Sequence, residues 1–172
     1  MTTKKNKKDR LAVPSAAVEV PSFDPLMVSE LIEACRANVA SLTEFAEVTS
    51  RALRECYEYE DDEPHLWQCC DLVRQVLAQA QTALVPLGVI SHETAPITRA
   101  AEVANGCEEQ QQRLRPAVHV IRAAIYILRG LESNHDDQVH RALRDLEIGI
   151  ASVVDGLERG IQYCSNNART DA

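Results

Sequence analysis

The chain has 172 residues, a formal net charge of −8 and an apolar fraction of 45%. This length is sufficient for one domain with a sizeable core, and the apolar fraction excludes a chain that is disordered throughout. The acidic balance argues against nucleic acid as a partner. No apolar run approaches the roughly 18 residues of a membrane span, so we expect a cytoplasmic protein that has no membrane partner.

The lysine and cysteine residues indicate the coding bias of the source, a basic tail and the state of the thiols. All four lysines lie in the first ten residues, whereas thirteen arginines and no lysine follow from Leu11 onward. This bias is typical of GC-rich bacterial coding, and we predict that residues 1–24 form a disordered basic tail. The six cysteines show no CxxC spacing, which predicts reduced and mostly packed thiols instead of a disulfide framework.

A long amphipathic helix is predicted from Pro25 to about residue 59. Asp24 and Pro25 form a helix start, with proline at the first helical position. Apolar positions then recur at alternating intervals of four and three, which is typical of a helix with one buried face. These positions are Val28, Ile32, Cys35, Val39, Leu42, Ala46, Thr49, Leu53 and Cys56.

A second helix is predicted after an acidic turn near residues 60–64. Pro86 and Gly88 end it, and residues 87–95 form the connector to the second half of the chain. The apolar positions of this helix follow the same spacing and are Leu66, Cys70, Val73, Leu77, Ala80 and Leu84.

Two further helices are predicted, the first beginning at Pro96 with Thr94 or Ser91 as its cap. Because Pro116 lies inside that helix, we expect a kink or a break near residues 112–116. Its apolar positions are Ile97, Ala101, Ala104, Cys107, Leu114, Val118, Ile121, Ile125 and Leu128. The last helix follows a turn at residues 133–137, frays after Tyr163 and carries Val139, Leu143, Leu146, Ile150, Val153, Leu157 and Ile161.

The two halves of the chain resemble each other. The second and fourth helices share one apolar pattern at an offset of 73 residues, and a D-D-x-x-H sequence precedes or opens each of them. We predict an all-α antiparallel four-helix bundle over residues 25–165, built from hairpins 25–86 and 96–163, with a frayed C-terminus at 166–172.

The acidic turn raises the alternative of a metal site. A carboxylate and an imidazole three residues apart can face one ion, and the two D-D-x-x-H sequences would supply Asp62, His65, Asp137 and His140. A zinc site could instead use Cys56, His65 and Cys69. We favour a helix boundary without a metal or cofactor, because acidic residues and a proline suit the first turn of a helix.

An arginine-rich stripe on the third helix is the strongest candidate for a binding surface. Arg115, His119, Arg122, Tyr126 and Arg129 follow the helical spacing beside the apolar positions. Arginine and tyrosine are enriched at interface hot spots, so the stripe suits a protein partner with an acidic surface. The alternative is a flank of the bundle whose arginines pair with acids such as Glu44, Glu47 or Asp145.

Ala142, Gly149 and Gly156 recur every seven residues on the fourth helix, which predicts close helix packing inside the bundle or in a homodimer. The expected function is a non-enzymatic module for protein–protein interaction, with an acidic protein or a second copy as partner. The alternative is a metal-binding or hydrolytic bundle, for which Arg129 and His135 form a weak Arg-x5-His pair. No Ser/His/Asp set, phosphate-binding glycine loop or dinucleotide fingerprint is present.

Overall fold

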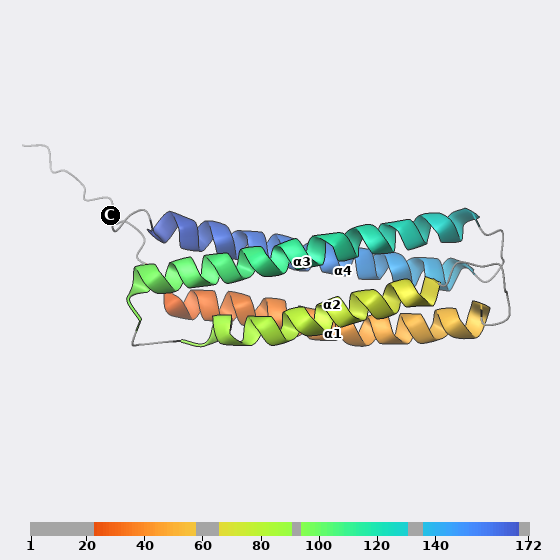
Figure 1. The fold of residues 1–172 in the computed structure, drawn as a ribbon, viewed down its shortest axis with the longest axis horizontal. Coiled ribbons are helices and arrows are strands. Elements are labelled where there is room, and N and C mark those ends of the chain that lie inside the picture. Colours follow the sequence, from red (N-terminus) through yellow and green to blue (C-terminus); the bar gives the residue numbers. More distant parts are fainter. Residues whose placement is uncertain (1–22, 58–65, 91–93, 131–135, 169–172) are drawn as a thin grey trace, which may run out of the picture.

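The computed structural model describes residues 23–57, 66–90, 94–130 and 136–168. These residues form four helices, α1 (Pro25–Tyr57), α2 (Leu66–Gly88), α3 (Pro96–Gly130) and α4 (Asp136–Ala168) (Figure 1). The described residues contain no strand, so the predicted all-α fold is confirmed. None of the described helices has an apolar stretch that could cross a bilayer.

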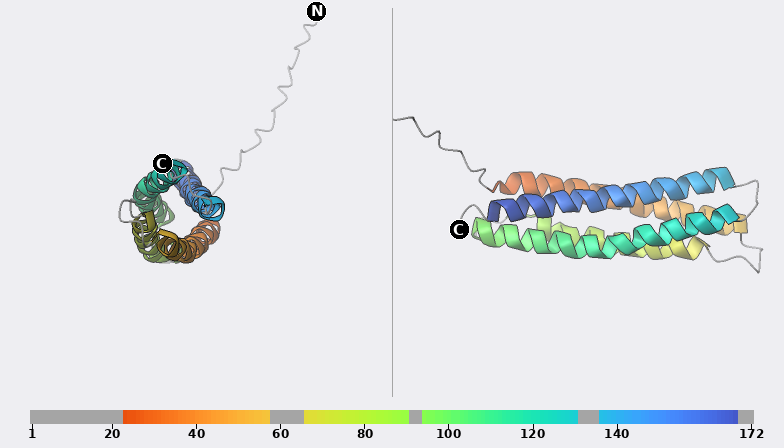
Figure 2. Two further views of the ribbon diagram at one scale, coloured as in Figure 1. Left: turned by 90° about the vertical axis from the view of Figure 1, so that its right-hand side faces the viewer. Right: turned by 90° about the horizontal axis from the view of Figure 1, so that it is seen from above.

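The helices form one antiparallel bundle. The end-on view in Figure 2 shows them around a common axis, and α1 packs most extensively on α2, as α3 does on α4. Contacts of α2 with α3 and of α1 with α4 close the ring. The four-helix bundle of two hairpins is therefore as predicted, with the seams inside each hairpin more extensive than the seams between hairpins.

The core follows the predicted apolar pattern closely in α2 and α4. All six predicted positions of α2 are buried, and so are the six positions of α4 from Val139 to Leu157. The offset of 73 residues thus pairs buried positions with buried positions. Leu42 and Ile161 lie at the edge of the core and are only partly buried.

The predicted core register was wrong in the first turns of α3. Ile97 is 44% exposed and Ala101 is exposed, whereas Ala100 and Val103 are buried in their place. Counting back from Cys107 in steps of four and three leads to Val103 and Ala100. The prediction started instead from Ile97, which is the first apolar residue of a helix end, where burial is incomplete.

Prolines inside the helices do not end them where predicted. α3 is continuous through Pro116 and only bends gently around its middle (Figure 2), so the alternative of a break was wrong. Pro116 is exposed and so lies on the outer face of α3, where a gentle bend moves its ring away from the carbonyl of the preceding turn. α2 passes Pro86 and ends at Gly88, the second of the two residues predicted to end it. α4 continues beyond Tyr163, where fraying was predicted, to Ala168.

The predicted start of α1 is confirmed. Asp24 Oδ1 accepts a hydrogen bond from the backbone N–H of Leu26 at 2.9 Å, which satisfies one of the donors that a helix N-terminus leaves open. The N–H of Asp24 donates to the hydroxyl of Tyr163 at 3.1 Å, and Phe23 packs near the Tyr163 ring. These contacts attach the start of α1 to the end of α4.

One arginine holds the junction between the hairpins. Arg99 Nη2 donates to the carbonyl oxygens of Pro86, Leu87 and Val89 at 2.8–2.9 Å. The Ser29 hydroxyl donates to the carbonyl of Gly88. The last carbonyls of α2, which have no partner within their own helix, are thereby satisfied from α3 and α1.

Several predictions fall outside the described residues. They are the tail predicted over residues 1–24, of which the structure describes only the last two, and the acidic turn near residues 60–64. The turn predicted at residues 133–137 lies outside the described residues up to 135, and the prediction was wrong for its last two residues, because they already belong to α4.

Candidate functional site

The arginine stripe of α3 lies on the surface. We call Arg115, His119, Arg122, Tyr126 and Arg129 the ridge. All five side chains are exposed, and Tyr126 is the most exposed of the large apolar side chains in the described part of the chain, at 79%. The helical spacing places the ridge beside the buried face of α3, so that its side chains lie along the seam with α4.

Three contacts join the ridge to α4. Arg122 Nε bonds Glu147 Oε1 at 2.5 Å, and Arg129 Nε donates to Nε2 of His140 at 3.1 Å. Arg115 lies 4.0 Å from Glu158. The acidic partners are therefore Glu147 and Glu158 instead of the acids suggested from the sequence.

Glu158 is held in place from α3. Gln111, which is buried, donates from Nε2 to a carboxylate oxygen of Glu158 at 2.6 Å, and Gln162 donates to the other oxygen at 3.2 Å. These two hydrogen bonds, with a smaller contribution from the charge of Arg115, lower the pKa of the Glu158 carboxyl. Glu158 is thus a fixed anion at one end of the ridge.

A shallow hollow opens beside the ridge. It has a volume of about 190 Å³ and lies between Arg115, His119 and Arg122 on one side and Ala151 and Asp155 of α4 on the other. A hollow with cations on its α3 side and one carboxylate on its α4 side can receive a polar side chain from a partner.

Only two of the suggested metal ligands, Cys69 and His140, have side chains among the described residues. Among the described residues no three histidine, cysteine or acidic side chains are placed to hold an ion. Cys69 is partly buried, and the ring of His140 accepts the hydrogen bond from Arg129. The remaining suggested ligands, Cys56, Asp62, His65 and Asp137, and the histidine of the Arg-x5-His pair, His135, have side chains outside the described residues.

The small residues of α4 face α1. A Cβ atom on Gly149 would clash with the end of the Leu42 side chain, and one on Gly156 would lie 3.0 Å from Sγ of Cys35. α1 therefore occupies the glycine face at these two positions. Near Ala142 the same seam opens into a hollow of about 280 Å³ lined mainly by apolar side chains, among them Phe45, Val48 and Ala52.

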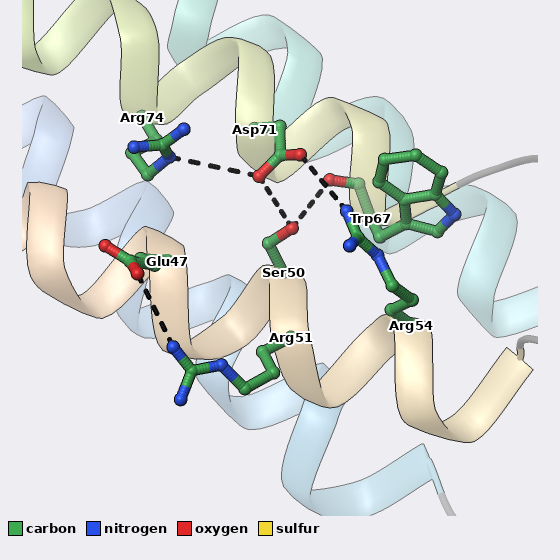
Figure 3. Close-up of polar contacts among 7 residues, drawn as sticks. All are labelled: Glu47, Ser50, Arg51, Arg54, Trp67, Asp71 and Arg74. Atoms are coloured by element: carbon green, nitrogen blue, oxygen red, sulfur yellow. Dashed lines mark hydrogen bonds and ion pairs between the residues drawn. The ribbon is translucent and has the colours of Figure 1, made fainter.

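A second polar site, which sequence reasoning missed, lies on the seam between α1 and α2 (Figure 3). We call Arg51, Arg54, Arg74 and Asp71, with Glu47 and Ser50, the arginine cluster. These six residues line a hollow of about 290 Å³. Their spacing along each helix was visible in the sequence, but only the register between α1 and α2 brings them together.

Asp71 is the centre of the arginine cluster. Its Oδ1 lies 2.8 Å from the hydroxyl of Ser50, a residue that is only 3% exposed. Arg54 Nη2 lies 3.6 Å from Oδ2, and Arg74 Nε lies 3.9 Å from Oδ1. Arg54 also stacks on the ring of Trp67, with Cζ 4.3 Å from the ring centroid.

The five cysteines whose side chains the structure describes all lie in environments that disfavour the thiolate. Burial raises the pKa of Cys70 and Cys107 to about 12 and that of Cys164 to about 11. Burial is also the main reason why the pKa values of Cys35 and Cys69 are raised. A nucleophilic or metal-binding cysteine needs the thiolate, which these environments disfavour.

The fold and surfaces define an antiparallel four-helix bundle with two arginine-bearing seams, one in each hairpin. Comparison with protein-family models, with curated proteins and with solved structures found no match to the chain in any of the three.

Proposed function

We propose that the protein is a non-enzymatic helical module that binds an acidic protein surface through the ridge. The observation that carries the proposal is Tyr126, which is 79% exposed between Arg122 and Arg129, one turn away on either side. An exposed aromatic ring flanked by guanidinium groups has the composition of an interface hot spot. Burying such a ring against a partner removes a large apolar area from water.

The contacts with α4 prepare the ridge for binding. The bond from Arg122 to Glu147 restricts that side chain, so less conformational entropy is lost when a partner docks. Arg129 bonds a histidine that acts as an acceptor and therefore brings no negative charge. Its own charge remains available to an acidic partner, and it lies next to Tyr126 on the helix surface.

A second copy of the chain is the other partner to consider. The chain carries a net charge of −8, so another molecule offers acidic surface to the ridge. Because α1 covers Gly149 and Gly156, a homodimer would form through the ridge and not through the glycine face.

The test is capture of partners from native cells, followed by mass spectrometry, with two charge-reversed variants. The test variant carries Arg115→Glu, Arg122→Glu and Arg129→Glu. The control carries Arg36→Glu, Arg113→Glu and Arg141→Glu, which change the net charge equally. The control also disrupts two arginine–glutamate pairs elsewhere on the surface, those of Arg36 with Glu33 and Arg113 with Glu109.

We expect the ridge variant to lose a partner that the parent and the control both retain, and we expect that partner to dissociate at higher salt. Light scattering on the purified protein identifies the case in which the partner is a second copy. Equal capture by both variants would contradict the proposal. Metal analysis of untagged protein tests the metal-binding alternative, which stoichiometric zinc or iron would favour.

A further inference from the structure

The arginine cluster combines an excess of positive charge with few hydrogen bonds. Three guanidinium groups and two carboxylates line the hollow, so its formal charge is positive although the chain as a whole is acidic. A local excess of positive charge attracts anions even though the protein as a whole is acidic, and it raises the concentration of anions near the hollow.

Few N–H groups of these three guanidiniums donate a hydrogen bond to another residue in the described part of the chain. Arg51 Nη2 lies 3.5 Å from Oε1 of Glu47, which is the upper limit for a hydrogen bond. The approaches of Arg54 and Arg74 to Asp71, at 3.6 and 3.9 Å, are ion pairs without a hydrogen bond. Arg74 Nε is inaccessible to water and has no hydrogen-bond partner among the described residues.

The Nε atom of Arg74 has lost its water and gained no hydrogen bond in exchange, which is unfavourable, while the side chain as a whole is 38% exposed and open to a ligand. Arg54 and Arg74 share Asp71, whose Oδ1 also accepts a hydrogen bond from the Ser50 hydroxyl at 2.8 Å. The cluster therefore lacks acceptor oxygens. Arg99, whose Nη2 bonds three carbonyl oxygens at 2.8–2.9 Å, shows how the same side chain is satisfied elsewhere in this protein.

We propose that the arginine cluster is a binding site for the phosphate group of a small phosphate monoester. Arg51 and Arg54 come from α1 and Arg74 comes from α2 (Figure 3), and all three line the hollow. Three guanidiniums suit the several oxygens of a tetrahedral dianion better than the two oxygens of a planar carboxylate. The hollow of about 290 Å³ lies at the lower limit of small-molecule sites and leaves room for an organic group beside the phosphate.

The acidic members of the cluster define how the anion would enter. Glu47 is exposed over 55% of its side chain, so it can turn into solvent and leave Arg51 to the ligand. Asp71 stays bound to Ser50 and keeps the guanidiniums of Arg54 and Arg74 near one another. Glu47 thus competes with the ligand, whereas Asp71 positions two of its donors.

The fluorescence of Trp67 can report binding of a ligand to the arginine cluster. It is the only tryptophan of the chain, and its ring lies against Arg54, so fluorescence of the full-length protein reports on the cluster. The probes are glycerol phosphate, inorganic phosphate and succinate, each compared with sodium chloride of the same ionic strength. We expect a saturable change in fluorescence with glycerol phosphate and a weaker or absent response to succinate.

Variants of the cluster have a matched control on α3. Arg51 with Glu47 and Arg113 with Glu109 are both exposed pairs with a spacing of four residues. We expect Arg51→Gln and Arg74→Gln each to weaken binding about tenfold, as the loss of a charge-assisted bond would. Glu47→Gln should tighten binding several-fold, whereas Arg113→Gln and Glu109→Gln should leave it unchanged.

The outcomes separate the sources of the phosphate group and the alternatives. Tighter binding of glycerol phosphate than of inorganic phosphate supports a phosphate monoester, and a saturable response to inorganic phosphate alone supports a site for the free ion. Preference for succinate, no response beyond that to chloride, or an equal loss in Arg113→Gln would overturn the proposal. Arg51 is 68% exposed, so Arg51→Gln remains informative even if Arg74→Gln folds poorly.

Discussion

The two hairpins each carry three arginines on their internal seam, and they use them differently. On the seam between α3 and α4, Arg115, Arg122 and Arg129 each have a separate partner, namely Glu158, Glu147 and His140. On the seam between α1 and α2, Arg54 and Arg74 share Asp71 at long distances. The arginines of the ridge are therefore each held by a contact of their own, whereas those of the arginine cluster lack acceptor oxygens, and this difference separates the protein-binding surface that we propose from the anion site that we propose.

Arg99 is the third case, and its removal should have the largest effect. It is only 15% exposed and bonds three carbonyls at the end of α2. Arg99→Ala leaves those carbonyls without a donor, and we expect a loss of about 3 kcal/mol in the free energy of unfolding. Chemical denaturation measures it, with Arg113→Ala as the exposed control. A loss no larger than that of the control would show that water replaces the guanidinium.

The seam between α1 and α4 should be sensitive to volume. Gly149 corresponds to Val76 of α2 at the offset of 73 residues, but its Cβ position is taken by Leu42. Gly149→Val should therefore destabilise the bundle by about 2 kcal/mol, as overpacking does. In Gly149→Ala, the end of the flexible Leu42 side chain can move aside, and a gain of about 1 kcal/mol in helix propensity offsets the contact. Equal stability of both variants and the parent would indicate a looser seam.

Buried thiols in both hairpins should make the fold sensitive to alkali. The pKa of Cys70 in α2 and of Cys107 in α3 rises from 9.0 to about 12 because of burial. Below about pH 9 the thiols are neutral in both states, so they add no pH dependence. Between about pH 9 and 12 only the unfolded chain releases their protons, and stability falls as the pH rises.

Denaturation at several pH values under reducing conditions measures this loss. Cys107→Ala should lower stability at neutral pH, because it leaves a cavity, yet its stability should fall less steeply above pH 9 than that of the parent. Identical slopes for parent and variant would mean that the Cys107 thiol ionises as readily in the folded chain.

The fold was predictable because, in most of the chain, the spacing of apolar residues along each helix matches the face that the helix buries in the bundle. The spacing of apolar residues located all six buried positions of α2, and Asp24 marked the start of α1. The error in α3 arose at its first turns, where the prediction counted forward from the exposed Ile97 instead of back from the buried Cys107. Several apolar residues near that helix end fit a helical spacing, and hydrophobicity alone does not show which of them face the core.

The two arginine sites differ in what the sequence reveals. The ridge lies on one helix, so the spacing from Arg115 to Arg129 identified it. The arginine cluster depends on residues from α1 and α2 that meet only in one register, and apolar patterns of similar period can pack in several registers. Asp71 and Arg74 lie only two and five residues after Cys69 on α2, but the sequence does not show that Ser50 and Arg54 of α1 meet Asp71 there.

The last pair of variants has the smallest expected effects and compares the two seams directly. Arg122→Ala breaks a short pair with Glu147, and we expect a loss of about 0.5 kcal/mol, as for other exposed ion pairs. Arg74→Met should cost nothing or stabilise the fold slightly. It removes a buried donor without a partner and lowers the repulsion among three cations, while the methionine retains most of the apolar stem.

Both variants are compared with the parent by chemical denaturation at low and moderate salt. The deficit of Arg122→Ala should shrink as salt screens the pair that the parent retains. Arg74→Met should at the same time bind glycerol phosphate about tenfold more weakly, as Arg74→Gln should, whereas Arg122→Ala should bind it as the parent does. If Arg74→Met were instead the less stable of the two, Arg74 would hold the α1–α2 seam together, and its guanidinium would serve the fold before any ligand.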